Sequence, residues 1–180
     1  MPSQVGTYSL YIALIISIFL IFHYFFLKKI ESSNFNSRIF SLISIQFIMV
    51  LISFFSLIYA FFISDFSNEI VFNNSHTTKP LFYKISGTWG NHEGSLLLWL
   101  LVLTIFLFIF FIHSKKLSNN YRLLTVFFQE IIILGFLLFI LFTSNPFSSL
   151  FPIPKEGNGL NPILQDPALA IHPPNFIFRL

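Results

Sequence analysis

Long apolar stretches separated by short polar segments dominate this chain of 180 residues. Four of them are long enough to cross a bilayer, which requires about 20 helical residues at a rise of about 1.5 Å each. They cover about residues 7–27, 39–63, 95–112 and 123–142. The pattern predicts an all-α, polytopic membrane protein, with four transmembrane helices in residues 1–143 and a proline-rich outer-face segment, 144–180, leading into a truncated fifth helix.

The composition narrows the class of protein further. Hydrophobic residues make up 55% of the chain and charged residues 9%, against about 25% charged residues in a soluble domain. These values exclude a soluble enzyme, a disordered tail and a nucleic-acid-binding domain. The absence of cysteine excludes disulfides, Fe–S ligation and thiol catalysis in this chain. The 27 phenylalanines, which have T-rich codons, favour an AT-rich organellar genome.

The positions of the basic residues predict an orientation. Because Lys and Arg accumulate in loops on the inner side of a membrane, both short loops are expected inside. Both termini, the longer loop at 64–94 and the tail then lie outside, in the intermembrane space or periplasm. Six of the ten Lys and Arg residues are in the loops after the first and third stretches, namely Lys28, Lys29, Arg38, Lys115, Lys116 and Arg122.

The first polar segment on the predicted outer side, Trp89–Trp99, reads WGNHEGSLLLW. Asn91 is a residue type that caps helix N-termini, which would place His92 and Glu93 in the first turn of the third transmembrane helix. A carboxylate at that position interacts favourably with the helix dipole.

On a continuous helix Trp89, His92 and Trp99 would share one face. Gly90 and Gly94 have the spacing that permits another helix to approach closely. One interpretation of this segment is an aromatic belt at the membrane surface plus a helix cap. The other is a surface for a flat aromatic cofactor, with His92 as an axial ligand.

The second outer segment, 144–174, contains seven of the nine prolines and therefore cannot be helical throughout. It retains apolar residues such as Phe147 and Leu150, of which a disordered linker would have fewer. We expect an ordered, extended cap on the outer surface. It ends in His172-Pro173-Pro174, where the prolines suit the start of a fifth helix.

Glu130 lies within the fourth stretch, eight residues beyond Arg122 and thus about 12 Å along a helix. A carboxylate near the middle of a bilayer is costly and commonly functional. The sequence shows no basic partner at that depth, so a neutral acid and an ion pair with another subunit both remain open.

The two outer segments carry a family resemblance. Trp89–Trp99 resembles the WG-x-HEGSLLLW signature of the CcmF family, the haem lyase subunits of the cytochrome c maturation system. The tail resembles a second signature of that family, in the order NPF (145–147), LFP (150–152), EG (156–157), LNP (160–162), LQDP (164–167) and IHPP (171–174).

The resemblance implies a part in attaching haem covalently to apocytochrome c. His172 maps onto a histidine that ligates the iron of a b-type haem in transit, and it is the chain's only implied ligand to iron. His92, Trp89 and Trp99 map onto weaker candidates for contacts with haem. Glu93 is a further candidate site residue.

The resemblance also implies a set of partners. These are apocytochrome c, a haem chaperone and a thioredoxin-like subunit that presents the apocytochrome, together with other CcmF fragments, and all would meet at a lipid membrane.

The chain departs from the family pattern in length. It lacks the Trp-rich WWD loop, a second outer histidine and two intramembrane histidines that family members carry. We therefore expect a split mitochondrial gene or a truncated sequence. The chain would then be one component of a haem lyase and would be inactive alone.

The residues themselves leave two alternative functions open. One is a small subunit of a respiratory complex, in which Glu130 belongs to a proton path. The other is an assembly scaffold without a ligand, in which His92 and His172 only cap helices.

Overall fold

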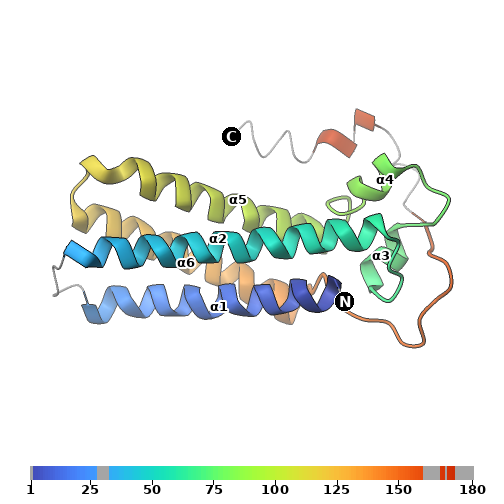
Figure 1. The fold of residues 1–180 in the computed structure, drawn as a ribbon, viewed down its shortest axis with the longest axis horizontal. Coiled ribbons are helices and arrows are strands. Elements are labelled where there is room, and N and C mark those ends of the chain that lie inside the picture. Colours follow the sequence, from blue (N-terminus) through green and yellow to red (C-terminus); the bar gives the residue numbers. More distant parts are fainter. Residues whose placement is uncertain (1, 28–32, 160–166, 169, 173–180) are drawn as a thin grey trace.

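The computed structural model describes residues 2–27, 33–159, 167–168 and 170–172. Four long helices lie side by side as a bundle (Figure 1). They are α1 (Pro2–Leu27), α2 (Ser33–Phe62), α5 (His92–His113) and α6 (Asn119–Phe142). All four are long and apolar enough to cross a membrane. The predicted all-α, polytopic membrane fold is confirmed.

The bundle forms a closed ring in which α1 packs on α2 and α6, and α5 packs on the same two helices. Each helix contributes fully buried side chains to one core, such as Leu10, Leu57, Leu100 and Leu137. The outer faces remain apolar, with Phe22, Phe55 and Phe128 more than half exposed. An apolar exterior around an apolar core is what a helical bundle in lipid requires.

Two short helices, α3 (Glu69–Asn74) and α4 (Leu81–Ser86), gather at the end of the bundle where α1 begins (Figure 1). The turn between α5 and α6, with the 3-10 helix η1 (Ser114–Lys116), lies at the opposite end. The first end therefore carries the loop from α2 to α5 and the proline-rich tail, and we call it the loop end.

Asn68 holds three segments together at the loop end. It is fully buried, and its Oδ1 caps α3 by accepting hydrogen bonds from the N–H groups of Ile70 and Val71 at 3.0 and 3.2 Å. Its Nδ2 donates to Ser3 Oγ at 3.1 Å and to the Pro146 carbonyl at 3.0 Å. One side chain thus connects the start of α1, the start of α3 and the tail.

Residues 145–159, which we call the strap, form a non-helical segment of turns and bends that backbone hydrogen bonds join to α3 near both of its ends. The Glu69 N–H donates to the Ser148 carbonyl at 2.9 Å, and the Asn158 N–H donates to the Phe72 carbonyl at 2.8 Å. Gly157 is required for this approach, because a Cβ there would lie 2.1 Å from the Ser75 carbonyl oxygen. The strap is non-helical, as its prolines predicted, but its turn at 146–147 and its bends at 151–152 and 155–156 differ from the extended conformation that we expected. The rest of the tail, apart from 167–168 and 170–172, is outside the described residues.

Glu156 anchors the strap to the loop after α3. Its carboxylate accepts hydrogen bonds from the Thr77 N–H at 2.9 Å and the Thr77 hydroxyl at 2.7 Å. The backbone hydrogen bond from Thr77 lowers the pKa of Glu156 below its ordinary value. A group whose pKa is lower in the folded state stabilises the fold at pH values above its unfolded-state pKa. That contribution is lost as the pH falls through the folded-state pKa.

We expect the strap to loosen with acid. Hydrogen-exchange protection of the Thr77 amide, corrected for the intrinsic rate, should persist down to the ordinary glutamate pKa of about 4.3 and disappear below it. Glu156→Gln should weaken the protection several-fold at neutral pH and abolish the acid step. Lys155→Gln, which changes an exposed neighbour, is the control, and a step that survives in Glu156→Gln would contradict the assignment.

Candidate functional site

The turn before α5 is built by side chains of the first polar motif. Asn91 caps the helix, because its Oδ1 accepts a hydrogen bond from the Gly94 N–H at 2.7 Å. Its Nδ2 donates to the Gly87 carbonyl, also at 2.7 Å. Ser95 Oγ lies 2.8 Å from the Trp89 carbonyl and 2.7 Å from the Asn91 carbonyl. The predicted cap is confirmed, and His92 and Glu93 occupy the first turn as expected.

Gly94 has a different role from the predicted one. A Cβ at this position would lie 1.6 Å from the Thr88 carbonyl oxygen and 3.1 Å from Asn91 Oδ1. The glycine therefore lets the chain fold back on its own first helical turn. The prediction that Gly94 serves the approach of another helix was wrong, because the space beside it is filled by the preceding loop.

Gly94→Ala should destabilise this turn by about 1.5 kcal/mol, since the added methyl group must displace backbone atoms. Thermal unfolding in detergent micelles measures the effect. Gly135→Ala is the matched control, because apart from its chain neighbours and the nearby backbone of its own helix no atom lies within 4 Å of a Cβ at that position. Equal stability of the two variants would show that the turn has room for a side chain.

Trp89 does not share a helix face with His92 and Trp99, because α5 begins at His92 and Trp89 lies in the turn before it. The prediction of one common face was therefore wrong. The Trp89 ring packs partly buried against the core, and its Nε1 donates a hydrogen bond of 2.8 Å to the Ala170 carbonyl. This bond joins the first polar motif to the tail two residues before His172.

His172 ends the described part of the tail, where residues 167–168 and 170–172 are helical. Its side chain is exposed, whereas Ala170 is buried. In Figure 1 this segment lies at the loop end, near α4. The tail thus presents an imidazole on the same end of the bundle as the first motif, as the sequence predicted.

His92 and Glu93 line a polar cleft of about 560 Å³. The wall opposite them belongs to α3, with Glu69, and to the start of the strap, with Asn145. The ring centroids of His92 and Phe139 are 6.4 Å apart, so the imidazole stands beside the end of α6. Trp89, Trp99 and His172 do not line this cleft. Across the described residues, no three His, Asp or Glu side chains are grouped so that they could hold a metal ion.

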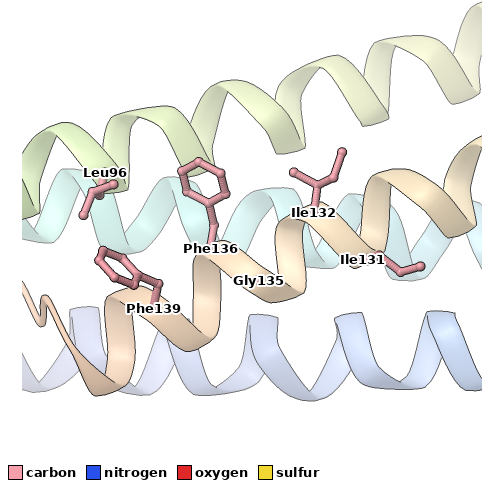
Figure 2. A pocket seen from close by; sticks show the side chains of 6 residues that line it. All are labelled: Leu96, Ile131, Ile132, Gly135, Phe136 and Phe139. Carbon is pink, nitrogen blue, oxygen red and sulfur yellow. The ribbon is translucent and has the colours of Figure 1, made fainter.

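A separate apolar groove of about 370 Å³ lies in the membrane region, beside α6 and Leu96 of α5. Phe139 lies beside His92 and also lines this groove. Leu96, one turn after His92 in α5, lines it as well, and Figure 2 shows Leu96 and Phe139 at the groove. The groove is lined by Leu96, Ile131, Ile132, Gly135, Phe136 and Phe139. His92 therefore lines the polar cleft and lies next to Phe139, which lines the apolar groove.

Glu130 is fully buried in the middle of the bundle. Its Oε2 accepts hydrogen bonds from Ser17 Oγ of α1 at 2.7 Å and from Gln46 Nε2 of α2 at 3.0 Å. Its Oε1 and Gln46 Oε1 have no hydrogen-bond partner among the described residues. The three side chains form an internal polar cluster that connects α1, α2 and α6.

The sequence argument missed the two partners of Glu130. Gln46 is the only amide side chain in the uncharged second stretch, 39–63. Its position near the middle of that stretch was the available signal of a buried polar contact. A polar residue at that depth requires a hydrogen-bonding partner on another helix.

Comparison with known proteins finds a matching family model and relatives that share one kind of name. Residues 89–179 match the family described as Cytochrome C assembly protein. The chain is 49% identical over 129 residues to the cytochrome c-type biogenesis protein ccl1 of Rhodobacter capsulatus, covering 72% of this chain and 20% of that protein. It is 44% identical over 140 residues to the cytochrome c-type biogenesis protein CcmF of Escherichia coli K12, covering 77% of this chain and 21% of that protein.

A solved structure of the cytochrome c haem lyase CcmF has the same fold over 83% of this chain, with a TM-score of 0.73 and 23% sequence identity. The matched part is 25% of that structure. The chain therefore spans about a fifth of the length of the curated relatives it matches and a quarter of the solved structure.

Proposed function

Because this chain belongs to the family of cytochrome C assembly proteins, we propose that it is part of a haem lyase that attaches haem covalently to apocytochrome c. The bond from Trp89 to the Ala170 carbonyl supports this assignment most directly, since it brings the two motifs of the family resemblance together at one end of the bundle. The curated relatives are cytochrome c-type biogenesis proteins.

The side chains at the loop end fit a partial haem site. The exposed His172 can supply one axial nitrogen to a b-type haem, and the donor set in the described residues offers no complete metal site. When bound, haem supplies the vinyl groups that react with the thiols of the apocytochrome. The rest of the haem ligation would come from the remainder of the family protein.

The chain's own residues would act by positioning. Trp89 holds the backbone of the 170–172 segment, and the capped turn around Asn91 holds Trp89 in place through the Ser95 hydroxyl. Preorganised geometry of this kind lowers the entropic cost of bringing reactants together. His92, Trp89, Trp99 and Glu93 remain proposed site residues, with His92 facing the cleft and Trp89 held at the tail.

We further propose a location and a set of partners. The chain would lie in the mitochondrial inner membrane, with the loop end in the intermembrane space. Its partners would be apocytochrome c, a haem chaperone, a thioredoxin-like subunit and CcmF fragments that carry the WWD motif. Alone, the chain would be inactive.

Affinity purification of the tagged chain from its native membrane tests this proposal. We expect it to isolate with other CcmF fragments and a haem-bearing subunit, and its depletion to lower the level of holocytochrome c seen by haem staining. A tagged, unrelated inner-membrane protein of similar abundance is the control. Recovery within a respiratory complex, with normal holocytochrome c after depletion, would overturn the proposal.

A further inference from the structure

The start of α2 and the turn from α5 to α6 lie at the end of the bundle opposite the loop end (Figure 1). Side chains of these segments line a pocket of about 480 Å³. Both candidate spans that border the turn, His92–Lys116 and Asn119–Phe142, reach their ends here. The pocket therefore lies where the membrane meets water. It is lined by Ser37, Phe40, Phe111, Ile112, Lys115 and Arg122.

Arg122 is buried at this site, with 6% of its surface exposed. Its Nε donates to Ser114 Oγ at 3.0 Å, its Nη2 donates to the Phe111 carbonyl at 3.3 Å, and its guanidinium carbon lies 4.3 Å from the centre of the Phe111 ring. A guanidinium has five N–H donors. Three of them thus remain without an acceptor in the described part of the chain, although the group is held in a fixed orientation.

The positive charge in this pocket has no acidic partner among the described residues. Of the seven acidic residues, Asp65, Glu69, Glu93 and Glu156 belong to the loop end, Glu130 lies in the middle of the bundle, and Glu31 and Asp166 are outside the described residues. Arg122 also sits in the first turn of α6, where the helix dipole favours negative rather than positive charge. Arg122, Lys115 and the dipole therefore all favour an anion in the pocket.

The pocket continues into an apolar surface on the membrane side. Phe40 of α2 lies at the pocket and stacks on Phe108 of α5 with ring centroids 5.8 Å apart. Phe47, two turns further into the bilayer, stacks on the same ring at 5.3 Å. Phe40 is 37% exposed, so part of this aromatic surface faces lipid. A ligand that matches both parts has an anionic head and an apolar tail.

We propose that this pocket is a binding site for an anionic phospholipid. The phosphate of the headgroup contacts Arg122 and Lys115, the Ser37 hydroxyl lies at its edge, and an acyl chain follows the aromatic surface between α2 and α5. Basic pockets between transmembrane helices are a known mode of recognising lipid headgroups. The site is independent of the haem-handling end and does not rest on the proposed function.

The test uses the assembly that contains this chain, purified in detergent and titrated with phosphatidylglycerol, phosphatidylcholine or inorganic phosphate. Native mass spectrometry counts the lipid molecules retained by each variant. Phosphatidylglycerol should be retained in preference to phosphatidylcholine. Lys115→Gln should weaken its binding about fivefold, the contribution of one cation near a membrane surface. Arg122→Gln should weaken it at least as much.

Lys116→Gln is the matched control, because it removes the same charge from the neighbouring exposed position and does not line the pocket. If Arg122→Gln fails to fold, Lys115→Gln decides the outcome, since Lys115 is exposed. Three results would each overturn the proposal: equal weakening by Lys115→Gln and Lys116→Gln, equal retention of phosphatidylcholine, or displacement of the lipid by millimolar inorganic phosphate.

Discussion

His172→Ala should abolish cytochrome c maturation while leaving the chain inserted in the membrane. The side chain is exposed at the loop end, and we expect its removal to leave the fold intact. Loss of a residue that only supports a metal ligand already lowers metal affinity or activity about 10–100-fold. Loss of the ligand itself should lower them further. Holocytochrome c, measured by haem staining, should fall more than tenfold.

His113→Ala is the matched control for this experiment. His113 is also exposed, but it ends α5 at the opposite end of the bundle. Its loss should leave holocytochrome c unchanged. Trp89→Phe provides a graded test, because it keeps an aromatic ring and removes the hydrogen bond to the Ala170 carbonyl. We expect an intermediate level of holocytochrome c. A normal level of holocytochrome c in His172→Ala would contradict the assignment of His172 as a ligand.

Local chemistry could be predicted from the sequence in the cases where a residue acts within its own turn. Asn91 caps α5 as expected, because an N-cap requires only an acceptor side chain and the next three N–H groups. The absence of helix from the strap followed from its prolines, which interrupt helices. The four long helices followed from the lengths of the apolar stretches. Each of these features depends on neighbours in sequence.

Contacts between distant segments could not be predicted in this way. Trp89 and Ala170 are 81 positions apart, and Gln46 and Glu130 are 84 positions apart. Nothing in the periodicity of either segment specifies its partner, because pairing depends on how the helices are arranged around the ring. The error at Gly94 has the same origin, since a small residue permits close approach without indicating which backbone approaches. Arg122 is a further example. The sequence placed it in a loop with the other basic residues, but its side chain is buried through contacts with α5.

The internal polar cluster should contribute substantially to stability, and Glu130→Leu should lower the free energy of unfolding by about 3 kcal/mol. Leucine fills a similar volume but cannot accept the hydrogen bonds of Ser17 and Gln46. A buried donor left without an acceptor costs about 1–3 kcal/mol, and Ser17 can recover part of this by bonding to its own helix. Chemical unfolding in detergent micelles measures the change.

Glu130→Gln distinguishes the alternatives that the sequence left open. A glutamine side chain keeps the shape of the acid and an oxygen that can accept the same two hydrogen bonds. If Glu130 is a structural acid, this variant should keep wild-type stability and normal holocytochrome c. If Glu130 moves a proton, the variant should lose activity at wild-type stability. An ion pair with another subunit is excluded, because Glu130 is fully buried inside this chain's own bundle.

The neighbouring Gln129 supplies the control for both variants. It is only half-buried, and its Nε2 makes a long hydrogen bond of 3.5 Å to the Leu103 carbonyl. Gln129→Leu should therefore cost less than about 1 kcal/mol, the ordinary value for a polar contact between membrane helices. If Gln129→Leu and Glu130→Leu destabilise the bundle equally, the cluster of Ser17, Gln46 and Glu130 has no special part in holding α1, α2 and α6 together.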